Sequence, residues 1–274
     1  MHTLTHRSAT FKNDSLFHAE YALAIEELLE IYIDDSPYAA TMRLPGDDFN
    51  LVAGFCFSEG IVDAWNDFLE IAHCRAARNP NRMMVRLRAN GPPGAAPHSL
   101  RKGHVSKSGC GVCGKERASD ICMNIQPLSR FDQLNLRDIW RLKSMYDCRQ
   151  ELFKITGATH SVAIFDQSRD LLAFAEDIGR HNAFDKTIGR ILQGDHLEEV
   201  FLAIVSSRLS FEMTQKAARA GVQILCGLSA PTSMAVAMAA DLNITLIGFL
   251  RHQSLTIYTH PERILTNFSD RKNF

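Results

Sequence analysis

The sequence predicts an α/β protein with a mixed α+β N-terminal part. In the second half, near-continuous apolar segments such as VFLAIVS and ITLIGFL alternate with segments of helical periodicity. Strands of that kind indicate a sheet that is covered on both faces and is largely parallel in its core. With 274 residues, 46% of them hydrophobic, the chain is long enough for one large domain or two ordinary ones.

The N-terminal part predicts a compact α+β region over residues 20–73. LEIYIDDSPYAATMRL alternates in hydropathy around a turn signal at Asp34 to Pro37, which predicts a hairpin. DDFNLVAGFCFSEGIV predicts a helix that ends at Gly60. The alternation from Met83 to Ala89 predicts another strand.

The amino-acid composition differs in the middle of the chain from that on either side. ANGPPGAAPHSLRKGHVSKSGCGVCGK is dense in Gly, Pro and Ser and predicts a linker or mobile loop. We therefore divide the chain into an N-terminal α+β region, a mobile loop and linker, and a C-terminal α/β domain, at residues 1–102, 103–130 and 131–274.

The C-terminal region predicts helices and strands in alternation. The expected helices cover 136–156, IGRHNAFDKTIGRILQG as far as Gly194, SFEMTQKAARAG, and PTSMAVAMAADLN with Pro231 in its first turn. The expected strands are SVAIFD, LLAFAED, VFLAIVS, VQILCG, ITLIGFL and LTIYTH.

Charge and cysteine content limit the classes of function. Lys and Arg (30) balance Asp and Glu (31), and the net charge of −1 argues against a general attraction to nucleic acid or to a membrane surface. The first residues lack the apolar core of a secretory signal, and no apolar run approaches the ~20 residues that span a bilayer, so we expect a cytoplasmic protein. Seven irregularly spaced cysteines are not typical of a disulfide framework, and we expect reduced thiols.

The segment VSKSGCGVCGKE holds Cys110 and Cys113 among three glycines. Lys107 and Lys115 favour a thiolate, and the glycines leave both sulfurs accessible to a large partner, which is typical of a reactive cysteine. The alternative is that both thiols are ordinary small residues, as we expect for buried Cys56 and Cys226.

Two zinc hypotheses have weaker support. A structural site needs four ligands, and no second C-x-x-C or H-x3-H accompanies the pair, so His104, Cys122 or Cys148 would have to be recruited from irregular spacings. A zinc deaminase is suggested by the H-x-E at His18 to Glu20, but the proline that should precede the first cysteine is missing.

Three loops that follow apolar strands share a chemical character. SSRLS, LSAPTS and LRHQS supply small hydroxyl side chains and two arginines. Parallel strands place their carboxyl ends at one edge of a sheet, where ligands bind. The candidates for phosphate groups are Arg208, Ser210, Ser229, Thr232 and Arg251. Neither GxGxxG nor GxxxxGK[ST] is present, and plain helix capping by Ser and Thr remains the alternative.

The stretch EDIGRHNAFDK places polar residues at a predicted helix start. Its candidate site residues are Arg180, His181 and Asp185, and the last two share a helix face. Two interpretations stay open: a site that positions an anion or tunes a proton, and a solvated helix start with a satisfied histidine.

With these residues in view, the chain resembles the FdhD family, sulfur carriers required for formate dehydrogenase activity. The strings that carry the resemblance run almost end to end: TMRLPGDDFNLVAGFCFSEGIV, SGCGVCG, EDIGRHNAFDK, SSRLSFEMTQKAARAG, SAPTSMAVAMAADLNITLIGF and IYTH.

The resemblance implies a specific activity and fold. It implies that Cys110 accepts persulfide sulfur from a cysteine desulfurase, with Cys113 as the second thiol, and that the sulfur passes to the bis(molybdopterin guanine dinucleotide) molybdenum cofactor. It also implies a homodimer, a C-terminal cytidine-deaminase-like α/β/α fold of three layers, and no metal held directly by protein side chains. The implied cofactor segment is Phe249, Leu250, Arg251, His252, Gln253 and Ser254.

Two further hypotheses stay open beside the sulfur carrier. One is a chaperone that delivers the molybdenum cofactor to formate dehydrogenase without transferring sulfur. The other is an interaction module stabilised by zinc.

Overall fold

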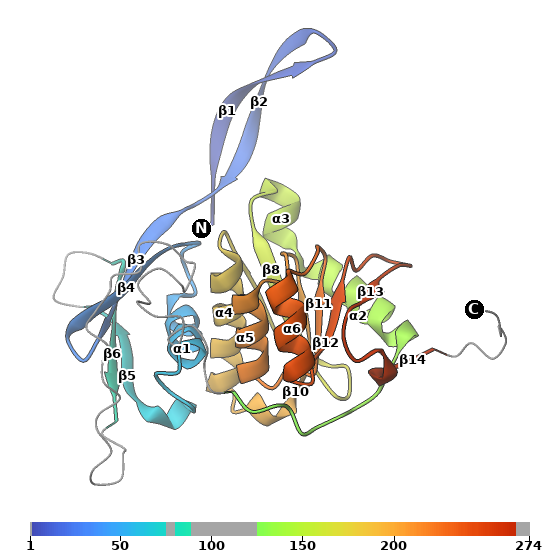
Figure 1. Ribbon diagram of the computed structural model, residues 1–274. Helices are drawn as coiled ribbons and strands as arrows, with labels where there is room; N and C mark the ends of the chain where they lie inside the picture. The colour runs from blue at the N-terminus through green and yellow to red at the C-terminus, as the bar shows by residue number, and fades with distance from the viewer. Residues whose placement is uncertain (1, 75–79, 89–124, 267–274) are drawn as a thin grey trace. The chain divides into compact units, whose positions relative to one another are not determined.

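A computed structural model describes residues 2–74, 80–88 and 125–266. The chain divides into two compact units (Figure 1). Unit 1 comprises Met1–Met123, Gln150–Ser161 and Ala175–Asp195, and unit 2 comprises Asn124–Arg149, Val162–Phe174 and His196–Phe274. The expected boundary between residues 102 and 103 lies outside the described residues, so the division at 102 and 130 stays a prediction.

The helices and strands have the following bounds. The strands are β1 (Thr3–Lys12), β2 (Ser15–Ala24), β3 (Glu27–Ile33), β4 (Ser36–Arg43), β5 (Phe68–His73), β6 (Arg82–Leu87), β7 (Leu134–Asn135), β8 (His160–Asp166), β9 (Leu171–Asp177), β10 (Val200–Val205), β11 (Ile224–Gly227), β12 (Thr245–Gly248), β13 (Thr256–Ile257) and β14 (Ile264–Leu265). The α-helices are α1 (Asp48–Ser58), α2 (Leu136–Arg149), α3 (Glu151–Thr156), α4 (Arg180–Gln193), α5 (Phe211–Arg219) and α6 (Ser233–Asp241).

Unit 1 contains two antiparallel hairpins. β1 and β2 form a sheet of their own with an unbroken register from Thr3↔Ala24 to Lys12↔Ser15. β3 and β4 form the second hairpin within a four-stranded sheet of order β4-β3-β6-β5. The turn at Asp34 and Asp35 has φ of 45° and 65°, the left-handed conformation that tight hairpin turns require. The hairpin predicted around these aspartates is confirmed.

Helices α1 and α4 of unit 1 cross at two glycines. A Cβ at Gly54 would lie 1.8 Å from the carbonyl oxygen of Asp185, and a Cβ at Gly189 would lie 2.0 Å from that of Asn50. The backbones therefore approach too closely for any side chain at these two positions. As predicted, α1 is followed by a left-handed Gly60 (φ 73°) and α4 ends at Gly194.

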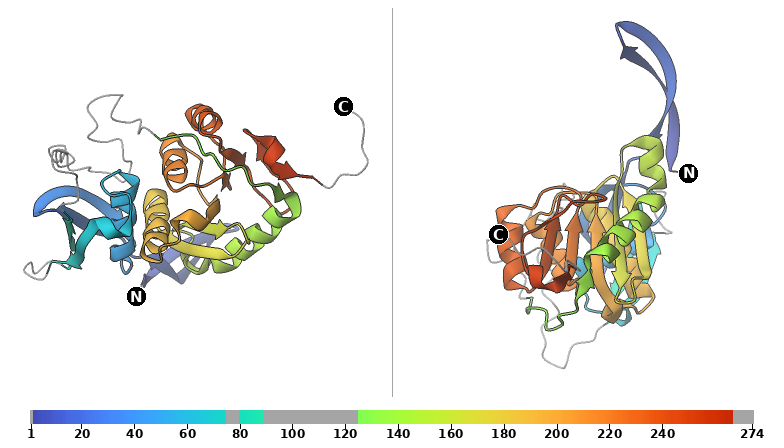
Figure 2. Two further views of the ribbon diagram at one scale, coloured as in Figure 1. Left: turned by 90° about the horizontal axis from the view of Figure 1, so that it is seen from below. Right: turned by 90° about the vertical axis from the view of Figure 1, so that its right-hand side faces the viewer.

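Unit 2 is built around a six-stranded sheet of order β13-β12-β11-β10-β8-β9. The β10, β11 and β12 pairs are parallel, whereas β8 and β13 pair antiparallel with their neighbours. Helices α5 and α6 lie on one face and α2 lies on the other, which gives three layers (Figure 2). This arrangement confirms the predicted α/β class with a mixed sheet and a parallel core.

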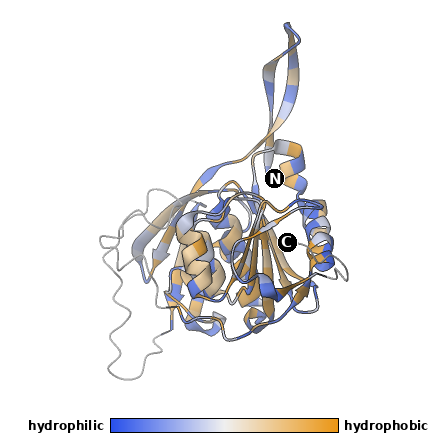
Figure 3. Cartoon of the chain, turned by 45° about the vertical axis from the view of Figure 1, so that its right-hand side comes forward, coloured by the Kyte–Doolittle hydropathy of each residue, from blue (hydrophilic) through white to orange (hydrophobic). Residues whose placement is uncertain are grey.

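The core of unit 2 joins α2 to the sheet. Ile139, Leu142 and Tyr146 of α2 are fully buried against strand residues such as Phe165 and Ile204. Full burial of each such side chain contributes about 1.5–3 kcal/mol. The central strands are hydrophobic along their length, as Figure 3 shows, because both faces of the sheet are covered.

Three local expectations were wrong or incomplete. The helix expected over 136–156 is divided at Gln150, whose ψ of 65° is not helical and whose buried amide donates to the Ser161 hydroxyl at 2.6 Å. Pro231 precedes α6 instead of lying in its first turn, because Thr232 is the N-cap. The strand expected over LTIYTH is only two residues long in β13, and the β1–β2 hairpin was not predicted.

In the described part of the chain, no helix combines the length and the apolar character needed to cross a bilayer.

Candidate functional site

The paired thiols Cys110 and Cys113 lie outside the described residues. Cys56 in α1 and Cys226 in β11 are fully buried, as predicted. Burial raises the pKa of both thiols above the ordinary range, and the charges of Asp185 and Glu59 raise that of Cys56 further. Neither thiol is therefore a thiolate near neutral pH, which leaves them as packing residues.

The three polar loops predicted to share a sheet edge do lie together. We call the segments 206–210, 228–233 and 249–254 the strand-end loops. They follow β10, β11 and β12, and because these strands are parallel their carboxyl ends meet at one edge. All three loops belong to unit 2.

Backbone hydrogen bonds tie the strand-end loops to one another. Leu209 N donates to Ala230 O at 3.1 Å, and Thr232 N donates to Leu209 O at 2.9 Å. Phe249 N donates to Ser229 O at 3.2 Å. The loops therefore form one connected surface whose polar side chains are held at fixed spacing.

Glycines at the ends of two strands permit this close association. A Cβ at Gly227 would lie 2.6 Å from the Leu209 side chain. A Cβ at Gly248 would lie 3.0 Å from both Pro231 and Tyr258. Larger residues would push the loops apart, so both glycines serve the shape of this edge.

Phe249 and Leu250 begin the predicted cofactor segment and differ sharply in environment. Phe249 is 44% exposed and has a φ of 52°, an uncommon conformation for a residue with a side chain. Leu250 is fully buried in the core of unit 2, so only its backbone is available to a ligand. Backbone strain of this kind occurs at binding sites, where the surrounding structure holds it.

The two arginines of the loops are exposed. Arg251 donates through one terminal nitrogen to the carbonyl oxygens of Leu228 (2.6 Å) and Leu250 (2.9 Å), and its backbone N–H bonds Ser254 O at 2.8 Å. These bonds hold the guanidinium over the second loop and leave its other nitrogens available. Arg208 projects from the first loop and is also exposed.

The remaining members of the segment are exposed as well. His252 Nε2 lies 3.7 Å from a carboxylate oxygen of Asp147 in α2, and Gln253 and Ser254 are open to solvent. Sequence reasoning missed Asp147, a half-buried residue that also pairs with Lys143 on the same helix, because its place in the helix does not signal a neighbour more than a hundred residues away.

The candidate hydroxyl groups differ in whether they cap a helix. Thr232 accepts a hydrogen bond from Ala235 N at 3.3 Å and so caps α6, as the capping alternative expects. Ser210 stands at the N-cap of α5 but makes no side-chain cap bond, and its Oγ is buried with no hydrogen-bond partner. Buried polar atoms without a partner are rare, so the Ser210 hydroxyl is available to a ligand at a helix N-terminus. Ser229 contributes its backbone carbonyl to Phe249.

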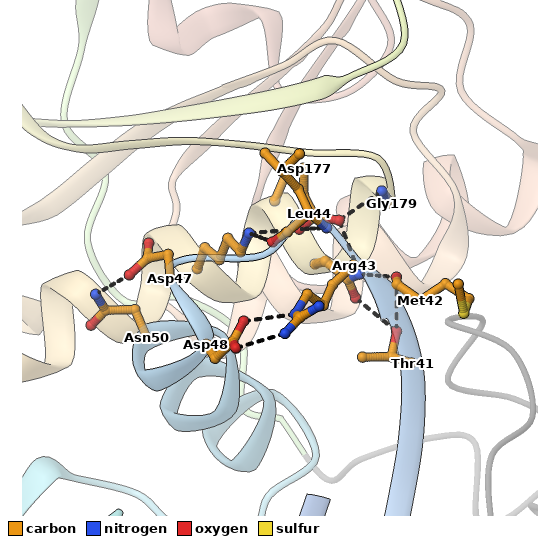
Figure 4. A network of polar contacts seen from close by, with 12 residues as sticks. Thr41, Met42, Arg43, Leu44, Asp47, Asp48, Asn50, Asp177 and Gly179 are labelled. Atoms are coloured by element: carbon orange, nitrogen blue, oxygen red, sulfur yellow. Dashed lines mark hydrogen bonds and ion pairs between the residues drawn. The ribbon is translucent and has the colours of Figure 1, made fainter. Parts of the chain in front are cut away.

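The EDIGRHNAFDK stretch forms a buried network within unit 1 (Figure 4). Asp177 accepts hydrogen bonds from Leu44 N (3.1 Å) and Asn182 Nδ2 (3.0 Å) and pairs with Lys186 Nζ at 2.7 Å. Lys186 Nζ also donates to Leu44 O at 2.8 Å, and Asn182 Nδ2 donates to Met42 O at 2.7 Å. These contacts join the start of α4 to the end of β4.

Burial decides against a solvated helix start. His181 and Asp185 are both buried, and Asp185 accepts a hydrogen bond from the Ser58 hydroxyl at 2.7 Å. Burial lowers the pKa of the adjacent His160, and the positive charge of Arg180 lowers it further against the opposing effect of Asp177. The ligand roles suggested for Arg180, His181 and Asp185 stay predictions.

Arg43 supports the same region from the end of β4. Its guanidinium binds Asp48 through two nitrogens at 2.8 Å each, and a third nitrogen lies 3.1 Å from Glu27. Burial acts to lower the pKa of Arg43, but the bonds and charges of Asp48 and Glu27 outweigh it, and the pKa is raised. The paired charge fixes the entry into α1.

Comparison with known proteins places the chain in one family by both the family model and individual relatives. The sequence model of the FdhD/NarQ family matches residues 24–265. The Sulfur carrier protein FdhD of Sulfurisphaera tokodaii is 40% identical over 247 residues, which cover 89% of this chain and 91% of the relative. The protein of the same name from Saccharolobus solfataricus is 36% identical over 258 residues, 94% of each chain.

A solved structure is similar in fold. A crystal structure from Desulfotalea psychrophila, described as a formate dehydrogenase accessory protein, matches with a TM-score of 0.78 and 23% identity. The match covers 97% of this chain and 100% of that one. At this level of identity, the likeness supports the fold alone.

Proposed function

Because this chain belongs to the FdhD/NarQ family, we propose that it is a sulfur carrier that serves the maturation of formate dehydrogenase. The observation that carries the proposal is the match to the family over residues 24–265, with relatives named as sulfur carriers that cover about nine-tenths of the chain. The proposed donor is a cysteine desulfurase. The proposed acceptor is the bis(molybdopterin guanine dinucleotide) form of the molybdenum cofactor, and the carrier acts as a homodimer in the cytoplasm.

The proposed chemistry is persulfide transfer at Cys110. The Cys110 thiolate attacks the outer sulfur of the persulfide on the desulfurase, and the desulfurase cysteine leaves as a thiolate. The bond between the two donor sulfurs breaks as a new sulfur–sulfur bond forms on Cys110, so no external oxidant or reductant is needed.

Release of the sulfur has two chemical routes. In the first, the Cys113 thiolate attacks Sγ of Cys110, a disulfide forms between the two cysteines, and the outer sulfur leaves as hydrosulfide with two electrons. In the second, the acceptor takes the outer sulfur directly and Cys113 only shields the persulfide. A Cys113→Ala variant separates these routes, because only the first requires that thiol.

The strand-end loops are the proposed site for the guanine nucleotide part of the cofactor. Their donor set suits phosphate: two exposed arginines, Arg208 and Arg251, and the buried, unpartnered hydroxyl of Ser210 at the N-terminus of α5. Gln253 and Ser254 add exposed polar groups beside Phe249, whose ring is available for contact with a base. Within the described residues, no group of three or more potential ligands could hold a metal ion.

A cysteine variant tests the proposal in cells. Cys110→Ala should abolish formate dehydrogenase activity in a strain that lacks its own carrier, because the attacking thiolate is gone. Cys148→Ala is the matched control, since Cys148 is an exposed cysteine on α2. If Cys110→Ala supported full activity at equal protein level, the cofactor-delivering chaperone would replace the sulfur carrier.

A further inference from the structure

The last of the strand-end loops, residues 249–254, connects β12 to β13 and turns back at His252. Arg251 N donates to Ser254 O at 2.8 Å and closes the turn. Leu250 fixes the base of the loop, because it is fully buried in the same hydrophobic core as Tyr146 of α2. The loop is therefore attached to α2 at its base, and its closed tip carries the His252 side chain.

Asp147 of α2 is the residue that the tip of the loop contacts. A carboxylate oxygen of Asp147 lies 3.7 Å from His252 Nε2. The same carboxylate accepts a hydrogen bond from Lys143 Nζ at 2.6 Å, one turn earlier in the helix, and Lys143 is only 6% exposed. A buried ammonium group needs an opposite charge, so this pair holds the Asp147 side chain in place whatever the charge of His252.

The contact between Asp147 and His252 depends on the charge of the imidazole. A distance of 3.7 Å is too long for a hydrogen bond and suits an ion pair. Histidine gains and loses its charge between about pH 5 and pH 8, so the full attraction is present only in the lower part of that range. The carboxylate therefore orients the ring of His252 only while the ring is protonated.

The charged groups around the imidazole come from α2 and from the loop itself. Lys143 is already neutralised by Asp147. The charges that oppose a protonated imidazole are Arg251 on the loop and Arg149 in the last turn of α2. The C-terminal end of a helix favours a positive charge through its dipole, and this effect acts together with Asp147.

The rest of the imidazole is open to a ligand. The His252 side chain is 73% exposed, and among the described residues its Nδ1 has no hydrogen-bond partner. Arg251, the preceding residue, is held by its bonds to two carbonyl oxygens and belongs to the same closed turn. Two adjacent cationic side chains on an anchored loop suit a group such as phosphate, because charge and hydrogen-bond donors act together.

We propose that Asp147 is a positioning residue for His252, which in its protonated form joins Arg251 in binding an anionic group of phosphate type at the strand-end loops. Binding then weakens as the pH rises and His252 loses its charge. The inference rests on the strand-end loops as the proposed nucleotide site. It adds a residue from outside these loops and a dependence on pH.

Sulfate is the probe for the test, because it has the shape of phosphate and its charge is the same at both pH values used. NMR titration of the full chain at constant ionic strength measures the dissociation constant at about pH 5.5, where histidine is charged, and at about pH 8, where it is neutral. The wild type should bind sulfate about fivefold more tightly at the lower pH, the size of effect expected for an exposed charge. His252→Gln should bind it equally at both.

His196→Gln is the matched control for the histidine. His196 is also exposed and lies 2.8 Å from a carboxylate oxygen of Glu199. It precedes β10 and so lies at the amino ends of the parallel strands, away from the strand-end loops. This variant should keep the fivefold difference of the wild type.

Lys143→Met/Asp147→Asn tests the positioning role. It removes one positive and one negative charge, so the net charge stays the same and no buried charge is left uncompensated. Binding of sulfate should weaken at about pH 5.5 and stay unchanged at about pH 8, because only the protonated His252 loses its support. Asp138→Asn/Arg169→Gln is the control: it removes a pair 3.5 Å apart that also involves α2 and should bind sulfate as the wild type does.

The outcomes separate the inference from the site on which it rests. Equal affinity of the wild type at both pH values, with binding still weakened by Arg251→Ala, would overturn the role of His252 and leave the anion site intact. A pH dependence that is lost in His252→Gln but kept in Lys143→Met/Asp147→Asn would overturn the positioning role of Asp147. Sulfate binding that neither Arg251→Ala nor His252→Gln changes, or no binding at all, would count against the strand-end loops themselves.

Discussion

Lys186 and Asp177 form an ion pair that is almost completely removed from solvent. Their side chains are 2% and 0% exposed, and the nitrogen and oxygen lie 2.7 Å apart. Two charges in such a place are tolerated only because backbone groups of Leu44 and Gly179 complete their hydrogen bonds. The pair is therefore a structural requirement of the start of α4, and no sequence pattern identified its partners across more than 130 residues.

Lys186→Met should lower the free energy of unfolding by about 3–5 kcal/mol, because Asp177 remains buried as an uncompensated charge. Urea unfolding followed by circular dichroism measures the change. Asp177→Asn/Lys186→Met should recover part of the loss, since it removes both charges. A single variant as stable as the wild type would show that the pair does not hold this region.

Arg251→Ala should weaken binding of GDP, a probe for the guanine nucleotide part of the cofactor, by about tenfold or more, because a charged hydrogen bond contributes about 1.5–3 kcal/mol. Calorimetric titration measures the affinity. Arg137→Ala is the control, because Arg137 is an exposed arginine on α2 outside the strand-end loops. Equal affinities for wild type and Arg251→Ala would remove this residue from the proposed site.

At the scale of elements, helix packing in unit 1 depends on Gly54 and Gly189. Each lies against a backbone carbonyl of the opposing helix, so neither helix can rotate or withdraw to admit a side chain without losing its own packing. The sequence shows both glycines within helical patterns, where they usually cost stability. The need for glycine at these two positions becomes clear only from the position of the opposing helix.

Gly54→Ala and Gly189→Ala should each destabilise the protein by about 3 kcal/mol or more, because the added methyl group overlaps backbone atoms. Gly157→Ala provides the comparison: nothing lies within 4 Å of its Cβ, and only its φ of 67° opposes the change. That variant should lose only about 1 kcal/mol. Thermal unfolding of the three variants measures their losses of stability. Equal losses of stability at all three sites would contradict the close helix crossing.

The elements that sequence predicted well are those with local signals. Asp34 and Asp35 identified the β3–β4 turn, and Gly60 and Gly194 marked the ends of α1 and α4, because each of these residues acts through its own backbone. The division between α2 and α3 was missed because it depends on the amide of Gln150 reaching Ser161, a contact between elements. The β1–β2 hairpin was missed because exposed strands with mixed polar residues carry a weak signal.

In the candidate site, too, features with a local signal in the sequence were predictable and features that depend on contacts were not. The meeting of three loops at one sheet edge was predictable, because parallel strands dictate it. The sequence could not predict which hydroxyl caps a helix and which has no partner. Thr232 and Ser210 both stand at the N-cap of their helices and differ only in hydrogen bonding.

At the scale of the whole molecule, two observations bear on the proposed function: the overall charge and the extent of the family match. A net charge of −1 supplies no general attraction for an anion, so the proposed binding of the anionic cofactor relies on local groups, for which we propose Arg208 and Arg251. The family match spans all but the first 23 and the last nine of the 274 residues, and the C-x-x-C segment lies inside it. The central claim is that sulfur is carried on Cys110.

Mass spectrometry of the intact protein and its peptides tests this claim most directly. The protein is incubated with a cysteine desulfurase and cysteine under non-reducing conditions. The account predicts one added sulfur that is localised to Cys110 and removed by a reductant. Absence of added sulfur on both Cys110 and Cys113, with a demonstrably active desulfurase, would contradict the carrier role and favour delivery of the cofactor without sulfur transfer.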